Sequence, residues 1–328
     1  MEETSKKVLE VNNLSTHFFT KKGEVFAVDN VSISVDKGEI VGIVGESGSG
    51  KSITSLSIMQ LLPDYGKIIN GTIMLEGKNL LEYNNKQMSL VRGKDISMIF
   101  QEPMTSLNPV YTVGKQVKEA LLIHNNIKNQ EAKEEVLKIF NMVGIGDAEK
   151  RYNSYPHQLS GGLRQRVMIA MALICKPKLL IADEPTTALD VTIEAQILRL
   201  LANLRDETGT SIIMITHNLG VVAEVCDYVY VMYAGKIVEQ SDVFELYDNP
   251  KHPYTKGLLK AMPGRNECSN RLYSIKGMVP NMAYPPLGCR FNQRCSEVME
   301  ICKKEEPPLI KINDKCSVSC WKYKGGVR

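Results

Sequence analysis

The eight residues from Gly45 to Ser52 constrain this chain more than any other part of its sequence. They read Gly-Glu-Ser-Gly-Ser-Gly-Lys-Ser and directly follow Ile40–Val44, a short apolar run typical of a buried strand. A G-x-x-x-x-G-K-[ST] sequence between a strand and a helix forms a phosphate-binding loop, in which backbone N–H groups point at phosphate oxygens. We therefore expect Lys51 to contact the outer phosphates of a nucleotide and Ser52 to bind Mg²⁺. A Gly/Ser-rich turn that binds nothing would not require the Lys-Ser ending.

Strand and helix patterns alternate through the later part of the chain. Apolar, β-branched runs at Leu179–Ala182 and Ser211–Thr216 predict two further buried strands. Between them, Val191–Glu207 carries apolar residues at helical spacing, which predicts a helix that buries one face. Strand, helix and strand in this order indicate an α/β core with a parallel sheet. Tyr228–Met232 and Lys236–Glu239 flank an Ala-Gly turn and predict a hairpin.

The chain is predicted to contain a large domain over residues 1–250 and a smaller one over residues 251–328. With 328 residues, 43% of them hydrophobic, it is long enough for one large core and a second unit. Residues 103–159 show helical spacing and no convincing strand, so we expect a helical insertion there. Prolines become frequent after residue 250, and the smaller domain is therefore expected to be irregular.

Charge and hydropathy exclude some classes of partner. The chain has 40 Lys and Arg residues against 37 Asp and Glu residues, and no basic block that would follow a phosphate backbone, so nucleic acid is not expected as the main partner. It has no run of about 20 apolar residues, and its first residues lack the apolar segment of a signal peptide. The expected location is the cytosol, where its eight cysteines would be thiols or metal ligands.

Two adjacent carboxylates, Asp183 and Glu184, end the predicted strand Leu179–Ala182. Burying negative charge is costly unless a cation or a reacting group lies nearby. Beside a phosphate-binding loop we expect Asp183 to hold the Mg²⁺ shell, through water, and Glu184 to polarise an attacking water. On its own, the pair could equally be a strand end before a turn at Pro185.

A phosphate-binding loop alone would also fit a GTPase or a small-molecule kinase, and a second motif separates these classes. Leu159–Arg166 reads Leu-Ser-Gly-Gly-Leu-Arg-Gln-Arg and precedes a predicted helix over Val167–Ile174. At this point the sequence resembles the ABC ATPases, whose signature is LSGGQ or a close variant. The resemblance implies that Ser160, Gly161 and Gly162 bind the γ-phosphate of ATP held by an opposite subunit, at the positive end of a helix. A serine-capped helix start without a ligand is the alternative.

The resemblance covers residues 8 to about 245 and implies roles for further residues. Phe100–Pro103 matches the Q-loop, in which Gln101 would contact Mg²⁺. Ala188–Asp190 matches the D-loop at a dimer interface, and Asp190 is its acidic residue. His217 matches the switch histidine that contacts the γ-phosphate.

Phe18 aligns with the aromatic residue that stacks on adenine, although Phe19 and Phe26 are close in sequence. The other residues expected to contact ATP belong to the phosphate-binding loop and are Gly45, Ser47, Gly48, Ser49, Gly50, Lys51 and Ser52.

Longer strings resemble one branch of this family, the ATPases of oligopeptide and dipeptide permeases, which also includes nickel importers. They are Phe100–Pro109, Leu163–Arg166 and Asn249–Thr255. Leu163 stands where the family usually has Gln and this branch often has Met. The resemblance implies an α/β fold: a P-loop NTPase (RecA-like) core with an antiparallel β subdomain and a helical insertion. A small, irregular, cysteine-rich C-terminal domain would follow.

Five of the eight cysteines lie within the last 40 residues. Their C-x5-C-x6-C spacing is irregular for a zinc ribbon, whereas four thiolates can hold an iron–sulfur cluster. The resemblance to peptide-permease ATPases extends through this tail and implies a 4Fe-4S cluster, with a structural role, on Cys289, Cys295, Cys302 and Cys320. Cys316 is the competing fourth ligand, and unliganded thiols are the alternative to any cluster.

The resemblance implies a Mg²⁺-dependent ATPase that energises import of dipeptides or oligopeptides from the cytoplasmic face of a membrane. Its expected partners are a second, similar ATPase subunit, two membrane-spanning subunits and, indirectly, an extracytoplasmic binding protein. A heterodimer is expected in the cell, with a homodimer in isolation as an alternative. Rival functions are nickel import, a soluble ABC ATPase in DNA repair or on ribosomes, and an iron–sulfur protein that remodels nucleic acid. Weak net charge argues against the last of these.

Overall fold

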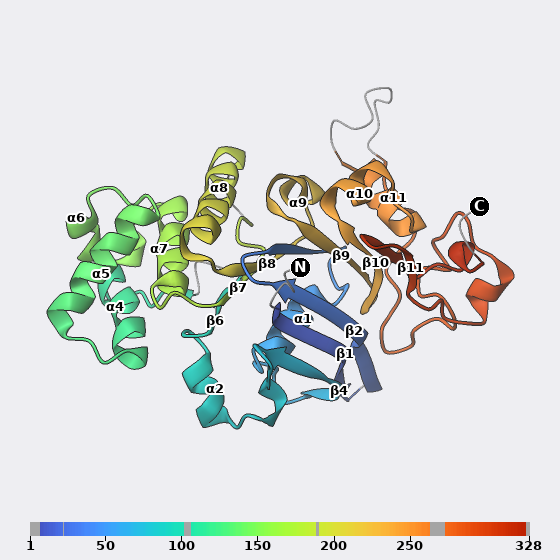
Figure 1. Cartoon of the computed structure of the whole chain (residues 1–328), viewed down its shortest axis with the longest axis horizontal. Helices are drawn as coiled ribbons and strands as arrows, with labels where there is room; N and C mark the ends of the chain where they lie inside the picture. The colour runs from blue at the N-terminus through green and yellow to red at the C-terminus, as the bar shows by residue number, and fades with distance from the viewer. Residues whose placement is uncertain (1–6, 22, 102–105, 188–189, 263–272, 326–328) are drawn as a thin grey trace, which may run out of the picture. The chain divides into compact units, whose positions relative to one another are not determined.

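The computed structural model describes residues 7–21, 23–101, 106–187, 190–262 and 273–325. The chain divides into two compact units. The first consists of Met1–Val8, Asp36–Glu39 and Glu82–Ile213, and the second of Leu9–Val35, Ile40–Leu81 and Met214–Arg328. Figure 1 labels helices and strands of both units, numbered in chain order. Among the described residues, no helix has both the length and the apolar character to cross a membrane.

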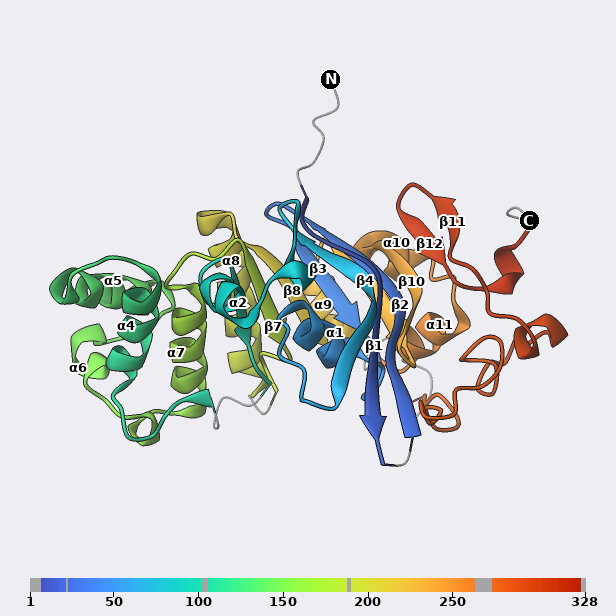
Figure 2. The same cartoon turned by 90° about the horizontal axis from the view of Figure 1, so that it is seen from below.

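The second unit contains an antiparallel sheet in the order β2-β1-β4-β5, formed by β1 (Lys7–Thr20), β2 (Gly23–Asp36), β4 (Gly66–Leu75) and β5 (Lys78–Asn79). Leu9 of β1 lies opposite Leu75 of β4, and both side chains are buried. The long ribbons of β1, β2 and β4 lie side by side in Figures 1 and 2. The antiparallel β subdomain predicted from the family resemblance is therefore present.

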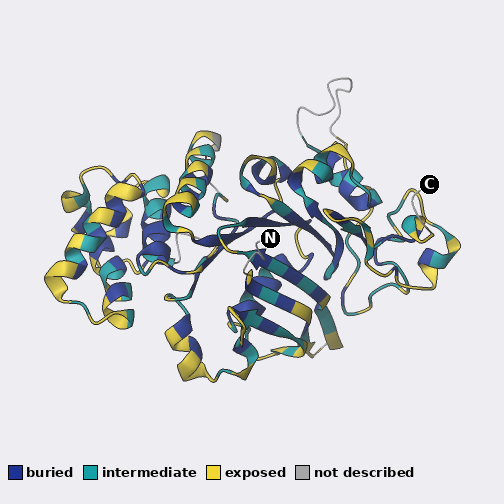
Figure 3. Ribbon diagram, in the orientation of Figure 1, coloured by how far each residue is buried: buried dark blue, intermediate teal, exposed yellow. Residues whose placement is uncertain are grey.

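The second unit also holds the strand that precedes the phosphate-binding loop. This strand, β3 (Ile40–Val44), is fully buried and runs parallel to β9 (Tyr228–Tyr233). A turn at Ala234 and Gly235 joins β9 to β10 (Lys236–Asp242), which pairs antiparallel with it. The predicted hairpin is therefore confirmed, and Figure 3 shows its strands as largely buried.

The C-terminal residues extend this sheet. The strand β12 (Cys316–Val318) pairs with β10, and β11 (Ile310–Asn313) pairs with β12. The rest of this region is short helical turns, η3 (Glu300–Lys303) and η4 (Trp321–Tyr323), and irregular chain. The remaining helices of the unit are α1 (Lys51–Ile58), α9 (Leu219–Val225), α10 (Val243–Asp248) and α11 (Pro253–Lys260), together with the helical turn η1 (Leu80–Glu82). The domain boundary near residue 250 stays a prediction.

The first unit combines two parallel strands with a group of helices. The strand β6 (Ile96–Ile99) runs parallel to β7 (Leu179–Asp183), whose five residues are all buried. The helix α8 (Val191–Thr208) follows β7 and leads to β8 (Ser211–Thr216), which agrees with the predicted strand, helix and strand. The other helices are α2 (Asn85–Val91), α4 (Val113–His124), α5 (Asn129–Met142), α6 (Ala148–Tyr152), the turn η2 (Pro156–Gln158) and α7 (Gly161–Leu173).

The predicted helical insertion corresponds to the helices α4, α5 and α6. The apolar residues that suggested it, Val136 and Phe140 on α5, are fully buried, and α5 packs against α4 and α7. No strand occurs in the described residues between positions 106 and 159. The helical insertion is therefore present, with periodic apolar side chains forming its core.

Candidate functional site

The loop from Gly45 to Ser52 has a backbone that favours glycine at three positions. Gly45, Gly48 and Gly50 have φ angles of 157°, 76° and 104°, in the region that side chains rarely adopt. A Cβ atom at Gly45 would lie 2.2 Å from the carbonyl oxygen of Met232, so the loop packs directly on β9. The glycines thus allow both the curl of the loop and its close approach to the neighbouring strand.

The Lys51 ammonium closes this loop. Nζ donates hydrogen bonds to the carbonyl oxygens of Gly45, at 2.8 Å, and Glu46, at 3.1 Å. The Lys51 side chain is buried, which keeps its charge within the loop rather than in solvent. The loop therefore carries a fixed positive charge among backbone amides, as expected for a site that binds phosphates.

Two further features of the loop fit a bound nucleotide. The Ser49 hydroxyl is buried and has no hydrogen-bond partner among the described residues. The helix α1 begins after Gly50, and no side chain caps its N-terminus. Uncapped N–H groups at a helix start attract anions, so this end of α1 suits a phosphate group with its Mg²⁺ on Ser52.

In the first unit, two predicted residues from distant parts of the chain lie in contact. Gln101 Nε2 donates to Glu184 Oε2 at 2.8 Å, and Thr187 Oγ1 donates to the same oxygen at 3.0 Å. Gln101 follows β6 and Glu184 follows β7, and these parallel strands end at one edge of their sheet. Asp183 is buried at the end of β7, while Glu184 has a positive φ of 45°. The parallel pairing therefore brings an amide and two carboxylates together.

The signature residues form the start of α7. Ser160 is the N-cap of this helix, and its Oγ accepts a 3.4 Å hydrogen bond from the Leu163 backbone N–H. Ser160 and Gly161 are exposed, and Gly162 is half-buried. The serine cap that served as the alternative interpretation is thus present, and it leaves both glycines at the positive end of a helix.

Gln165 is a site-related residue that sequence reasoning missed. It is buried on α7, and its Nε2 donates to the Pro185 carbonyl oxygen at 2.6 Å. This bond joins the signature helix to the turn directly after Glu184. A polar residue on the buried face of an apolar helix was the feature of the sequence that could have pointed to it.

The remaining predicted residues lie in different surroundings. Asp190 is exposed at the N-cap of α8, and Ala188 and Leu189 lie outside the described residues, as do Glu102 and Pro103. His217 is exposed at the end of β8 and belongs to the second unit.

Of the three candidate adenine-stacking residues, Phe18 is half-buried, and the centroid of its ring lies 5.5 Å from that of the Tyr65 ring. Phe19 is 45% exposed, and Phe26 packs against His17 with 4.7 Å between their ring centroids. Phe18 and Tyr65 together form an aromatic pair at the end of β1, and Tyr65 was not anticipated from the sequence.

Four cysteines of the C-terminal tail act on one another electrostatically. Burial first, and then Cys302, Cys320 and Cys295, raise the pKa of the Cys289 thiol to about 12. Burial and the neighbouring Cys295 and Cys302 likewise raise the pKa of Cys320. The backbone N–H of Cys289 also donates to the Cys302 carbonyl oxygen at 2.8 Å.

Cys316 lies in a different environment. It is on β12, opposite Ser241 of β10, and burial followed by Glu239 raises its pKa to about 11. The seven described cysteines are free thiols, and Cys268 lies outside the described residues. Among those residues, no group of three or more His, Cys, Asp or Glu side chains has an arrangement that would hold a metal ion.

Comparison with known proteins gives matches along nearly the whole sequence. Residues 28–187 match the ABC transporter family, and residues 238–302 match the C-terminal region of oligopeptide and dipeptide transporters. The oligopeptide transport ATP-binding protein AppD of Bacillus subtilis is 52% identical, with 96% of this chain and 97% of that protein covered. The dipeptide transport ATP-binding protein DppD of the same organism is 51% identical, with 96% and 94% covered.

Solved structures share the fold. A dimeric ATP-binding cassette in a post-hydrolysis state with ADP and Pi is similar with a TM-score of 0.65 and 26% identity, over 72% of this chain and 98% of that one. The cbiO1 subunit of a Clostridium perfringens ABC transporter complex is similar with a TM-score of 0.65 and 28% identity, over 74% and 92%.

Proposed function

The chain belongs to the ABC transporter family, among the ATP-binding subunits of peptide transporters, and on this premise we propose that it energises import of dipeptides or oligopeptides. It binds and hydrolyses ATP. The observation that carries the choice of substrate is the match of residues 238–302 to the C-terminal region of oligopeptide and dipeptide transporters, because the ATPase core alone is common to cassettes of many substrates.

The ATPase roles assigned to individual residues rest on the two arrangements described above. Lys51 and the loop amides bind the phosphates, and Ser52, Gln101 and Asp183 hold the Mg²⁺, which when bound neutralises phosphate charge. Glu184 polarises the attacking water. Its carboxylate is oriented by hydrogen bonds from Gln101 and Thr187, so that one oxygen is fixed before a water arrives.

The remaining contacts to ATP are assigned to the residues that match family motifs. Phe18 stacks on adenine, and His217 contacts the γ-phosphate. Ser160, Gly161 and Gly162 bind ATP held by the opposite subunit, with Asp190 at the interface. Exposure of Ser160, Gly161, Asp190 and His217 supports these roles, because a residue that reaches a ligand on another subunit must be accessible.

A glutamine substitution at Glu184 tests the hydrolytic role. Loss of the carboxylate should lower ATP turnover by at least about 100-fold, because general-base catalysis contributes that much, while affinity for a fluorescent ATP analogue stays within a factor of a few. Glu149→Gln on α6 is the matched control. The Glu149 side chain is largely exposed, and its ion pair with Lys133 is long, with 3.9 Å between Nζ and Oε1. Normal turnover in Glu184→Gln would reject the assignment.

Nickel import by the same ATPase is the alternative function, because this subunit is not expected to contact the transported solute. Uptake of labelled dipeptide, labelled pentapeptide and radioactive nickel should be compared in cells with and without the gene. Loss of peptide uptake alone supports the proposal, and loss of nickel uptake alone supports the alternative.

The proposed assembly places this subunit at the cytoplasmic face of the membrane, with a second, similar ATPase, two membrane-spanning subunits and an extracytoplasmic binding protein. Support comes from the solved cassette that is described as dimeric with ADP and Pi. Copurification from cells that express the Glu184→Gln variant, with ATP present, tests this assembly. Recovery of a second ATPase chain supports the heterodimer, and recovery of this chain alone supports a homodimer.

We also propose that the four mutually interacting thiols hold an iron–sulfur cluster. Ionised thiolates that interact in this way repel one another, and a bound cluster would supply positive charge that stabilises them. One thiolate binds each iron of a 4Fe-4S cluster, so its four ligands need not converge on a single ion. We assign Cys289, Cys295, Cys302 and Cys320 as ligands, and the distinct surroundings of Cys316 support its exclusion.

Iron and sulfide analysis of anaerobically purified protein tests this assignment. About four irons and four sulfides per chain are expected in the wild type and in Cys316→Ser, and clearly fewer in Cys320→Ser. The two serine variants differ only in which buried cysteine is removed. Zinc, or no metal, would remove the cluster from the proposed function and leave the ATPase unaffected.

A further inference from the structure

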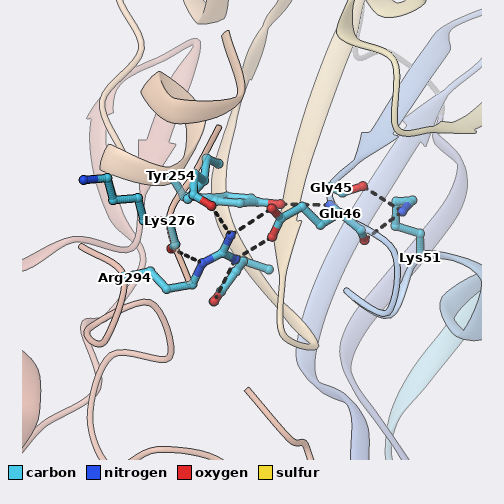
Figure 4. Close-up of polar contacts among 8 residues, drawn as sticks. Gly45, Glu46, Lys51, Tyr254, Lys276 and Arg294 are labelled. Carbon is cyan, nitrogen blue, oxygen red and sulfur yellow. Dashed lines mark hydrogen bonds and ion pairs between the residues drawn. The ribbon is translucent and has the colours of Figure 1, made fainter. Parts of the chain in front are cut away.

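Glu46, the second residue of the phosphate-binding loop, has each of its polar groups held by a partner. Its backbone N–H donates to the Tyr254 hydroxyl at 2.9 Å, and its carbonyl oxygen accepts from Lys51 at 3.1 Å. Its carboxylate accepts two bonds from Arg294, at 2.6 Å from Nη1 and 3.0 Å from Nη2. Figure 4 shows this series of contacts from Arg294 through Glu46 to Lys51.

Arg294 is itself held in place by backbone carbonyls of residues 275 and 276. Its Nε donates to the Lys276 carbonyl oxygen at 3.0 Å, and Nη2 donates to that of Ile275 at 3.3 Å. The guanidinium lies 5.6 Å from the centre of the Tyr233 ring, and its side chain is only 5% exposed, whereas that of Glu46 is 28% exposed. A buried, bidentate arginine with its remaining donors satisfied holds its partner in one orientation.

The position of this ion pair matters for an anionic ligand. A carboxylate in a phosphate-binding loop would repel ATP if it were not compensated. Arg294 compensates it through the two hydrogen bonds between its guanidinium and the Glu46 carboxylate. The positive charge of Lys51 then remains available to phosphates.

We propose that Arg294 is a nucleotide-positioning residue that neutralises and orients Glu46, and that the affinity of the loop for ATP therefore depends on the cysteine-rich tail. The tail is defined here as residues 286–325. Arg294 lies between two of its cysteines, Cys289 and Cys295, and adjoins the latter in sequence. The inference rests on the proposed role of the loop in binding ATP, but it does not require a cluster to be present.

Affinity of the full-length protein for a fluorescent ATP analogue provides the test. Arg294→Gln is expected to weaken binding on the order of tenfold, because it leaves the Glu46 charge uncompensated beside a polyanion. Arg294→Lys, which keeps the charge without the fork, should weaken it less. In the double variant Arg294→Gln with Glu46→Gln, affinity should return to within roughly twofold of wild type, since no unpaired carboxylate remains.

Arg290→Gln is the matched control for damage to the tail. Arg290 is another buried tail arginine, but it bonds the Ala234 carbonyl oxygen at 2.5 Å and pairs with Asp29 rather than with the loop. We expect it to leave ATP affinity unchanged. The proposal would be overturned if Glu46→Gln failed to restore ATP binding, or if Arg290→Gln lost as much ATP affinity as Arg294→Gln. Arg294 would then only stabilise the fold.

Lys51→Ala separates this proposal from the proposed function. If Lys51→Ala binds the analogue as tightly as wild type, the loop is not the ATP site and the proposed function fails. If Lys51→Ala loses binding while Arg294→Gln retains it in full, the proposed function stands and the inference about Arg294 is rejected.

Discussion

At the scale of single residues, buried ionisable groups at the start of α11 have unusual surroundings. Glu239 is fully buried on β10, and its carboxylate accepts backbone N–H bonds from Lys251 at 2.7 Å and His252 at 2.9 Å. His252 is 2% exposed, and its Nδ1 accepts a 3.0 Å bond from the Tyr254 N–H. Burial lowers the pKa of His252 to about 3, so the ring is neutral in the folded protein.

The low pKa of His252 predicts a loss of stability in mild acid. Its folded-state value lies below the unfolded value of about 6.5, so the unfolded chain binds more protons between these two values. The contribution of His252 is therefore complete above about pH 6.5 and falls by up to about 1.4 kcal/mol per pH unit below it. Urea unfolding of wild type and His252→Asn between pH 5 and 8 measures this slope.

Asparagine is the suitable replacement because it can cap α11 without titrating. Glu239, whose pKa is raised mainly by burial, contributes with the opposite sign, since its stabilisation is lost as pH rises through that raised value. This contribution is common to both proteins and cancels in their difference. Equal pH slopes for wild type and His252→Asn would contradict the prediction.

At the scale of elements, the helical insertion depends on a close approach between α4 and α6. A Cβ atom at Gly114 on α4 would lie 2.2 Å from the Tyr152 ring and 2.6 Å from its carbonyl oxygen. Both residues are buried, so the ring cannot turn into solvent to make room. Glycine is needed here for space rather than for backbone conformation.

Gly114→Ala is therefore expected to destabilise the protein by about 1–3 kcal/mol, the usual cost of overpacking. Gly146→Ala is the matched control, because a Cβ atom there meets nothing within 4 Å and no positive φ is required. Denaturant midpoints of the two variants provide the measurement. Equal stability of Gly114→Ala and wild type would show that α4 and α6 adjust freely.

A second element-scale prediction concerns the phosphate-binding loop. Gly45→Ala should abolish measurable binding of the ATP analogue, because its Cβ would meet the Met232 carbonyl oxygen on β9 at 2.2 Å and its φ of 157° disfavours a side chain. Gly38→Ala is the control, since Gly38 also has a positive φ but has open space for a Cβ. Tight binding by Gly45→Ala would contradict the packing of the loop on β9.

At the scale of the whole molecule, the two compact units do not follow the order of the chain. The second unit joins the phosphate-binding loop, near residue 50, with the tail that ends the sequence, while the first unit contains the helical insertion, α7 and β7. The strands β11 and β12 extend the sheet of β9 and β10, and so connect the tail to the core of the second unit.

This division predicts which segments would exchange hydrogen faster if the proposed tail cluster were removed. In hydrogen exchange, removal of the proposed iron should raise the exchange of α11 and of the loop at Glu46, because Phe291 and Arg294 of the tail contact Tyr254 and Glu46. The helices α4 and α5 belong to the other unit and serve as the internal control. Increased exchange in α4 and α5 to the same extent would indicate a global effect of metal loss.

The sequence by itself determined the local elements and the candidate residues for the chemistry. The strands Ile40–Val44 and Ser211–Thr216 have the predicted bounds, and the predicted Leu179–Ala182 differs from β7 by one residue. Short apolar runs bounded by turn residues are enough to predict these strands, since burial of a strand requires apolar side chains at consecutive positions. The motifs placed Lys51 and Glu184 in the same way, because phosphate chemistry needs particular groups at fixed spacing.

Only the tertiary structure decided which distant residues meet. Gln101 and Glu184 are 83 positions apart, and Arg294 and Glu46 are 248 apart, yet both pairs are in direct contact. Local periodicity holds no information on such pairs, because strand pairing and chain closure bring them together. The attachment of the tail to β10, and with it the placement of Arg294 on the phosphate-binding loop, is therefore a property of the folded molecule.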